Sequence, residues 1–340
     1  MSRRLLGGVG VLLVSFLGLL VFASSYHGEV VVPEGADHEY WAERIRKVGG
    51  PEAYRELSVF GAQGTRDSAH SNAHEFGSAL YTTLGQKGLS VCDSQFSFGC
   101  FHEFLGRAIE DKGLGVVFEL NKACREALGS SSLSCQHGIG HGIAVAVGYE
   151  RDQLDKALAV CEGLPFSDAI GGCYGGVLME YNVRTMGGER GVPRENTGPL
   201  EPCVSLRDPF ATACYFWQAQ WWGQQIFQGI SSPDTFAKMG AFCIGLPIEA
   251  HRRSCFQGIG NIAAHGGGFT AMGVRELCGA VSSLARYKLL CVAVAANHLG
   301  IETTDTEAKK ACLDFSDDEA IYCLAWAENK SNVAGSVPLP

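Results

Sequence analysis

The sequence predicts an all-α fold of seven disulfide-stapled helical hairpin repeats, arranged as a solenoid or as a closed α/α ring. Its fourteen cysteines form seven successive close pairs whose members lie 8 to 13 positions apart. The second cysteines recur every 32 to 41 positions, the length of a two-helix repeat, and no strand-like alternation interrupts these units. The pairs are Cys92/Cys100, Cys124/Cys135, Cys161/Cys173, Cys203/Cys214, Cys243/Cys255, Cys278/Cys291 and Cys312/Cys323.

The N-terminus predicts a membrane anchor. Arg3 and Arg4 precede an uncharged run of 18 residues, Leu5 to Phe22, which is just long enough to cross a bilayer. A cleaved signal peptide is the alternative, with Val21-Phe22-Ala23 as its cleavage site. In both cases the arginines stay on the cytoplasmic side, so we expect the body of the protein in the periplasm or outside the cell.

Export agrees with the cysteine pattern. An even number of cysteines in local pairs indicates disulfides in an oxidising compartment. The alternative, that they are reduced and buried as small hydrophobic residues, does not explain strict pairing in every repeat. Thiolate zinc sites are disfavoured because no C-x2-C spacing occurs, and a nucleophilic cysteine is disfavoured because all fourteen are paired.

The charge balance argues against nucleic acid as a partner. The net charge is −9, only 27 residues are Lys or Arg, and the chain has no long basic run. A hydrophobic fraction of 46% predicts a body that is folded throughout. The membrane, contacted through the N-terminal segment, is the first expected partner.

Two further helices are expected between the anchor and the first cysteine. Glu39 to Leu57 has an amphipathic pattern broken at Gly49-Gly50-Pro51, and Asp67 to Leu84 predicts a second helix. Met186 to Pro202 is rich in Gly and Pro and predicts a surface loop. The expected segments are a signal anchor (1–26), a linker (27–37), N-terminal capping helices with His-x3-His (38–91), seven Cys-paired repeats (92–330) and a tail (331–340).

The clearest single repeat runs from Asp152 to Met179. Its apolar residues have helical spacing up to Cys161, Gly163 ends that helix, and a second helix begins at Cys173. A Cys161–Cys173 disulfide would join the two helices and contribute about 3 kcal/mol. Glycines recur in the second helices and predict close helix packing: Gly138, Gly140, Gly142, Gly175, Gly176, Gly258 and Gly260.

The paired cysteines and the repeat length resemble the disulfide-stapled Sel1-type helical repeats of exported bacterial proteins, over about residues 92–323. That resemblance implies antiparallel helix pairs in an interaction scaffold. The glycine-rich turns Cys173-Tyr-Gly and Ala264-His265-Gly266 resemble those of the lanthionine-cyclase ring, which implies a closed ring of seven hairpins. The order His-x3-His-Glu, Cys-x-His and Cys-x-His-Gly-x-Gly-His resembles exported bacterial proteins of unknown function.

Histidines concentrate in the first third of the repeat region. In two pairs, the two histidines stand four positions apart in the sequence. This spacing places both imidazoles of a pair on one helix face, about 6 Å apart at Cβ. Imidazoles on packed helices, with carboxylates nearby, suit zinc, iron, manganese or copper, and the sequence does not choose between them. The expected metal ligands are His70, His74, His102, His137 and His141.

Carboxylates accompany these histidines at Glu75, Glu103 and, in the next repeat, Glu180. Glu75 or Glu103 is the expected catalytic residue, a general base acting on metal-bound water, and His102 is expected as a ligand or a proton shuttle. These residues predict an exported, membrane-tethered metalloprotein with a His-rich interior site. A metal-dependent enzyme is the more specific form of this hypothesis.

Two alternatives stay open. In the first, the histidines fill polar gaps in a hydrogen-bonded seam, because the sixth position after the second cysteine is polar in most repeats. Those positions hold His141, Met179, Gln220, Asn261, Asn297 and Asn329. In the second, the protein is a rigid scaffold whose partner is a peptide, a glycan or an envelope protein, anchored by Trp217, Trp221 and Trp222. The sequence has no Ser nucleophile elbow, P-loop or Rossmann fingerprint.

Overall fold

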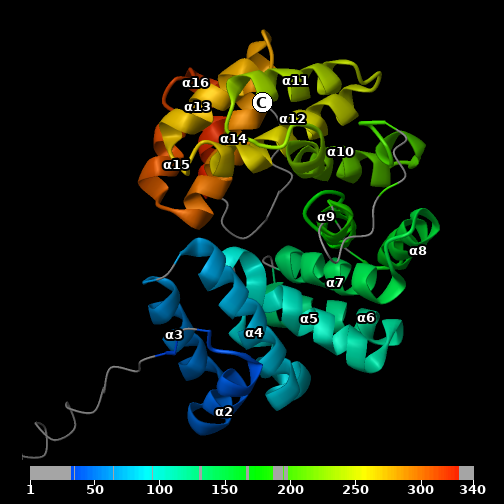
Figure 1. Cartoon of the computed structure of the whole chain (residues 1–340), viewed down its shortest axis with the longest axis vertical. Coiled ribbons are helices and arrows are strands. Elements are labelled where there is room, and N and C mark those ends of the chain that lie inside the picture. Colours follow the sequence, from blue (N-terminus) through cyan, green and yellow to red (C-terminus); the bar gives the residue numbers. More distant parts are fainter. Residues whose placement is uncertain are drawn as a thin grey trace, which may run out of the picture. The chain divides into compact units, whose positions relative to one another are not determined.

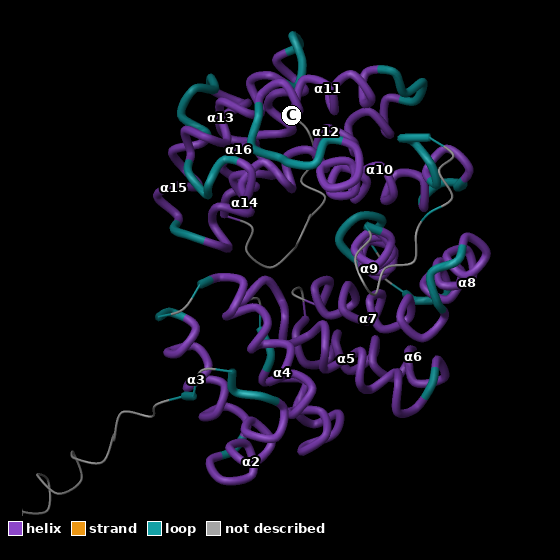
Figure 2. Tube along the Cα trace, viewed as in Figure 1, coloured by secondary structure: helices purple, strands orange, loops and turns teal. Residues whose placement is uncertain are grey.

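Helices make up the regular structure of the residues described. The computed structural model describes residues 32–33, 35–63, 65–93, 95–129, 132–165, 168–186, 194 and 198–328. Over these residues the chain forms fifteen α-helices and no strand, so the predicted all-α class is confirmed (Figures 1 and 2). The expected anchor at residues 1–26 and the tail at 331–340 lie outside them. The compact unit treated below begins at Ala36.

The helices have the following bounds. The α-helices are α2 (His38–Val48), α3 (Gly50–Gly61), α4 (Arg66–Leu84), α5 (Gly99–Lys112), α6 (Val117–Leu128), α7 (Ser132–Val147), α8 (Arg151–Glu162), α9 (Cys173–Thr185), α10 (Phe210–Trp221), α11 (Pro233–Ile244), α12 (Glu249–Gly266), α13 (Ala271–Ala280), α14 (Ala285–Glu302), α15 (Asp305–Ala311) and α16 (Asp317–Glu328). Shorter 3-10 segments are η1 (Gly85–Val91), η2 (Gln95–Phe98), η3 (Leu114–Val116) and η5 (Cys203–Ser205), and η6 (Trp222–Ile226) is a π-helix. None of the described helices combines the length and the apolar character of a bilayer span.

Local sequence explains where the first helices begin and end. The Asp37 carboxylate accepts a hydrogen bond from the Tyr40 amide at 3.0 Å and caps α2. Gly49, with a φ of 87°, separates α2 from α3, and Pro51 lies in the first turn of α3, so the predicted break is confirmed. Thr65 caps α4 in the same way as Asp37 caps α2.

All seven disulfides join near neighbours, as the pairing of the cysteines predicts. Their Cα–Cα distances lie between 5.3 and 5.8 Å, within the ordinary range for a disulfide. Most of them connect the end of a first helix to the start of a second, as Cys161 in α8 and Cys173 in α9 do. Seven disulfides indicate an oxidising, extracytoplasmic location for this body.

Two hairpins lack a full first helix in the described residues. Cys92 follows the 3-10 segment η1, and Cys203 lies in the 3-10 segment η5. Glycines at positions 85 and 88 weaken the first of these segments as an α-helix, and prolines 199 and 202 interrupt the approach to the second. The disulfide therefore occurs in every hairpin, whereas the α-helix before it does not.

The second helices of successive hairpins run parallel to one another. They pack in chain order, α4 on α5, α5 on α7, α7 on α9 and so on to α16 (Figure 1). Gly138 of α7 lies against Phe101 of α5, and Gly142 lies one turn further on against Gly106, so both helices advance in the same direction.

Close contact between these helices requires glycine. A Cβ at Gly140 would overlap the carbonyl oxygen of Cys173, and a Cβ at Gly176 would overlap that of His137. The backbones of α7 and α9 therefore touch directly, which explains glycine in helix interiors where it otherwise costs about 1 kcal/mol. The predicted close packing is present, and it fixes the register of the helix that carries His137.

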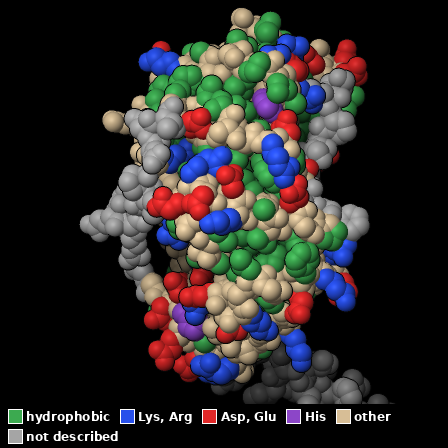
Figure 3. All heavy atoms as spheres, turned by 90° about the vertical axis from the view of Figure 1, so that its right-hand side faces the viewer, with side chains coloured by type: hydrophobic (Ala, Val, Ile, Leu, Met, Phe, Trp, Pro, Cys, Tyr) green, Lys and Arg blue, Asp and Glu red, His purple; other side chains and the backbone are tan. Residues whose placement is uncertain are grey.

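A segment near the first disulfide contacts a helix close to the C-terminal end of the repeats. The segment η2 packs on α14, and the Ser97 hydroxyl donates a hydrogen bond to the Glu302 carboxylate. The surface drawn in Figure 3 mixes both signs of charge, with lysine and arginine side chains interspersed among aspartate and glutamate.

Candidate metal centre

Three neighbouring helices bring the five expected histidines into one group, here called the histidine cluster. His70 and His74 lie on α4, His102 on α5, and His137 and His141 on α7. Because α5 packs against both α4 and α7, His102 lies between the two pairs. The ring centroids are 4.5 Å apart within the α4 pair and 4.9 Å apart within the α7 pair.

The cluster divides into two groups of three that share His102. One is His70, His74 and His102, and the other is His102, His137 and His141. In each group, one nitrogen per residue lies within 4.8 Å of the other two. A metal ion bound at about 2 Å from each nitrogen needs nitrogens no more than about 4 Å apart, so the rings would have to move closer together on binding. Both groups could hold a metal ion.

The backbone orients the first histidine. The Nδ1–H of His70 donates to the Phe96 carbonyl oxygen at 2.6 Å, which leaves Nε2 as the candidate ligand atom. That Nε2 lies 3.0 Å from the Nε2 of His74. Burial, and then the neighbouring His74, lower the pKa of His70, so the ring favours its neutral, metal-binding form.

The turn that presents this carbonyl is strained. Phe96, Ser97 and Phe98 have φ angles of 56°, 51° and 62°, and none of them is glycine. Each such residue costs about 1–3 kcal/mol and persists only where surrounding structure holds it. The Cys92–Cys100 disulfide encloses the turn, and Ser97 is hydrogen-bonded to Glu302. Strain at the residue that orients His70 is typical of a functional site.

A carboxylate orients the last histidine. The Nδ1–H of His141 donates to Oε2 of Glu180 at 2.9 Å, so its Nε2 is the atom left for a ligand. Arg184 and Tyr149 donate to the other carboxylate oxygen at 2.8 and 3.2 Å. Burial alone would raise the pKa of Glu180, but hydrogen bonds from His141 and Arg184 outweigh it and lower the pKa to about 2.

Several imidazole nitrogens of the cluster are buried with no protein partner in hydrogen-bond geometry. They are Nε2 of His102, Nε2 of His141 and both nitrogens of His137. Burial, and then the neighbouring histidines, lower the pKa values of His102 and His137 well below the ordinary value. The backbone of Gly172 approaches the His137 ring and opposes this effect without meeting hydrogen-bond geometry. The rings of His102 and His137 are therefore neutral donors of lone pairs.

The polar-seam alternative applies better to the later repeats. Asn297 is buried and donates to the Trp326 carbonyl of the next helix at 3.1 Å, as a structural amide would. His141 occupies the same position of its repeat but bonds to a carboxylate instead of a backbone carbonyl. The amide oxygens of Gln220 and Asn261, at the same position of later repeats, also lack a protein partner, so it is the carboxylate that distinguishes His141 from the seam.

The two expected general bases differ in position. Glu103 lies beside the cluster, with Oε2 at 3.8 Å from Nδ1 of His74. Glu75 is exposed, and no hydrogen bond or ion pair among the described residues joins it to a histidine. Glu180, expected only as an accompanying carboxylate, makes the closest carboxylate contact to the cluster.

The tryptophans expected to anchor a partner are mostly core residues. Trp217 and Trp222 are buried, and their indole N–H groups donate to the carbonyls of Ile170 and Pro199. Trp221 is half-buried, with the Arg194 guanidinium 4.5 Å from its ring centroid. The ring of Trp217 lies 5.2 Å from that of His137, so this tryptophan forms one wall of the cluster.

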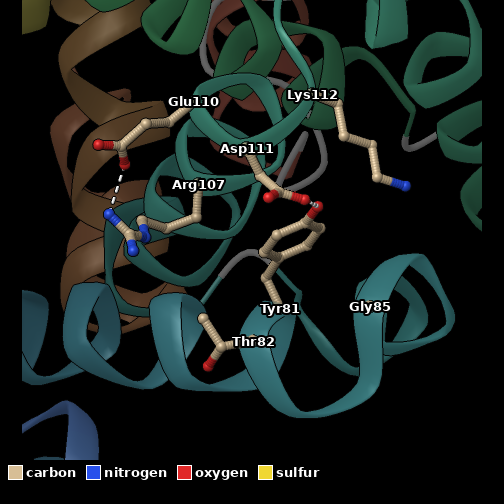
Figure 4. Close-up of a pocket in the computed structure, with 7 residues that line it drawn as sticks. All are labelled: Tyr81, Thr82, Gly85, Arg107, Glu110, Asp111 and Lys112. Carbon is tan, nitrogen blue, oxygen red and sulfur yellow. Dashed lines mark hydrogen bonds and ion pairs between the residues drawn. The ribbon is translucent and has the colours of Figure 1, made fainter.

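A separate pocket lies towards the C-terminal ends of α4 and α5 (Figure 4). In it Tyr81 donates to Asp111 at 2.8 Å, and Arg107 pairs with Glu110. His70, His74 and His102 lie in the N-terminal halves of the same helices, and the pocket lining includes no histidine of the cluster.

Sequence reasoning missed three parts of the site: the Phe96 carbonyl, the hydrogen bond from His141 to Glu180, and the Trp217 wall. Glu180 stands seven positions after Cys173 and His141 six after Cys135. When two such helices pack in parallel with an offset of one residue, these two positions face each other. That relationship is the one sequence signal that could have predicted the contact between His141 and Glu180. A backbone carbonyl gives no such signal.

Comparison with protein-family models, with curated proteins and with solved structures finds no match to this chain. The structure shows an all-helical body with seven regularly spaced disulfides in helix pairs, and the more specific resemblance to Sel1-type repeats stays a prediction.

Proposed function

We propose that the protein is an exported, membrane-tethered metalloprotein that holds a divalent transition-metal ion on His102, His137 and His141. One observation carries the proposal: their buried nitrogens converge within 4.8 Å of one another and include four atoms without a protein partner. Leaving a buried polar atom unsatisfied costs about 1–3 kcal/mol, so a metal ion that engages these lone pairs would stabilise the fold.

The ligand chemistry favours zinc or copper among the four metals that the sequence left open. The converging atoms are all imidazole nitrogens, whereas manganese prefers oxygen ligands and mononuclear iron sites combine two histidines with a carboxylate. The Glu180 carboxylate supports His141 from behind, as the second shell of a zinc or copper site does.

Metal-dependent catalysis is the finer form of this proposal. It would require a base beside the cluster, and Glu103 is better placed than Glu75 because it lies 3.8 Å from His74. The scaffold alternative keeps a peptide, glycan or envelope protein as its partner, with the half-buried Trp221 as the more accessible of the three expected anchors.

Metal analysis of the purified full chain tests the proposal. We expect at least one equivalent of zinc or copper per chain after dialysis against each ion, and about one equivalent less in His137→Ala. His265→Ala is the matched control, because this exposed histidine lies on α12 and belongs to neither group of three. Metal content that is absent in the wild type, or unchanged in His137→Ala, would contradict the proposal.

A further inference from the structure

The histidine cluster offers more ligands than one ion can use in its present arrangement. Five imidazoles form two groups of three, and no group of mutually close ligands in the described part of the chain combines members of the α4 pair with members of the α7 pair. A single ion at either group would leave two histidines unused. The shared member is His102 in both cases.

Ring positions place His102 between the two pairs. Its centroid lies 5.9 and 5.6 Å from those of His70 and His74 on one side. On the other side it lies 6.0 and 4.4 Å from those of His137 and His141. An imidazole has two nitrogens that point in different directions, so one ring can serve both groups.

Each pair also has an orienting partner of its own. The Phe96 carbonyl fixes His70 on the α4 side, and the Glu180 carboxylate fixes His141 on the α7 side. Both bonds use Nδ1–H and leave Nε2 directed to the cluster. Each group of three therefore contains one imidazole that is already oriented towards the cluster.

From these observations we infer that the cluster holds two divalent transition-metal ions with the His102 ring between them. This inference rests on the proposed function and adds a second ion, bound by His70, His74 and His102, to the one on His102, His137 and His141. When both nitrogens of His102 bind metal, its ring N–H bond breaks, the proton leaves to solvent, and a second nitrogen–metal bond forms.

The two ions would differ in access to solvent. His137 and His141 are 1% and 7% exposed, and the ring of Trp217 covers His137. The side chain of His74 is 35% exposed, and Glu103 lies beside it. The ion on His102, His137 and His141 would therefore be shielded from solvent. The ion on His70, His74 and His102 would keep a coordination position open to a small ligand such as water.

Titration of the metal-free full chain with Cu(II), followed by electron paramagnetic resonance, tests the inference. We expect two equivalents to bind. The first gives the signal of an isolated Cu(II), and the second reduces the integrated signal, because the two spins couple through the shared ring. Zn(II) should likewise bind with two equivalents by elemental analysis.

Variants separate the two sites. The double variant His70→Ala/His74→Ala should bind one equivalent with a full, uncoupled signal, and His137→Ala/His141→Ala should also bind one. If the buried double variant does not fold, His74→Ala decides the point, because it alters the more exposed side and should abolish the coupling. His265→Ala should keep two equivalents and the coupling.

The outcomes distinguish this inference from the proposal beneath it. One equivalent in the wild type, or two equivalents without spin coupling, would overturn the two-ion arrangement and leave a mononuclear metalloprotein. Failure to bind either ion would refute the proposed function itself.

Discussion

His141 and Glu180 are joined across the interface of two parallel helices, with 2.9 Å between Nδ1 and Oε2. Glu180 is also bonded to Arg184 and Tyr149, so its position is set by three side chains. The contact therefore fixes the orientation of His141, a candidate ligand on α7, relative to α9.

Replacement of Glu180 by Gln should weaken metal binding about 10- to 100-fold, because the amide no longer holds the imidazole in the tautomer that exposes Nε2. Competition between the protein and a chromophoric chelator for Zn(II) measures the change. Glu162→Gln is the control, since Glu162 pairs with Arg207 on the surface. Equal affinities of wild type and Glu180→Gln would show that the contact is not part of the site.

Substitution of Gly140 by Ala should destabilise the protein by about 1–3 kcal/mol, since the new methyl group overlaps the Cys173 carbonyl and forces α7 away from α9. Urea unfolding monitored by circular dichroism gives the free energy. Gly106→Ala on α5 meets open space and should be neutral or stabilising by up to about 1 kcal/mol. Similar behaviour of the two variants would mean that the backbones of α7 and α9 do not touch.

Removal of the Cys161–Cys173 disulfide by a double alanine substitution should lower stability by about 2–3 kcal/mol, because the loop that it closes is short. The same urea experiment measures the effect. Non-reducing peptide maps of the wild type should show each cysteine linked to its near neighbour. A dominant long-range link such as Cys100 to Cys135 would refute the repeat arrangement.

A reporter enzyme fused after Pro340 should be active only in an exported form. The reason is the predicted topology, in which Arg3 and Arg4 stay in the cytoplasm and the acidic segment beyond the apolar run is translocated. A matched reporter that works only in the cytoplasm should be inactive at the same position. The reverse result would overturn both the predicted anchor and the predicted location.

Acid should weaken the contact between Asp208, in the turn before α10, and His251 of α12. Burial alone would raise the pKa of Asp208, but hydrogen bonds from His251 and Thr212 outweigh it and lower the pKa. A carboxyl with a lowered native pKa stabilises the fold above about pH 4 and loses that contribution as the pH falls through its native pKa. Asp208→Asn should therefore be less stable than wild type at pH 6, with a smaller difference at pH 3. A difference that does not shrink would contradict this.

The sequence predicted most of the fold because the spacing of the cysteine pairs defines the repeat. It predicted the break at Gly49 and the start of the helix at Cys173, since both depend on local chemistry. It did not predict the 3-10 segment before Cys92 or the one that begins at Cys203, where glycine or proline weakens a helix that the spacing alone implied.

The site was predicted less completely than the fold. Helical spacing was enough to pair His70 with His74 and His137 with His141, but the central position of His102 depends on how three helices pack. The turn at Phe96 was also beyond prediction. Phenylalanine and serine disfavour positive φ, so no residue there indicates the left-handed backbone that tertiary contacts impose.

The local character of the disulfides has a consequence for the order of assembly during export. Each bond spans 8 to 13 positions, so it can close while the rest of the chain is still crossing the membrane. The histidine cluster spans His70 to His141 and cannot assemble until two hairpins have emerged. In the proposed protein the disulfides can therefore close before metal loading, and a chain exported unfolded would take up its ion in the destination compartment rather than in the cytoplasm.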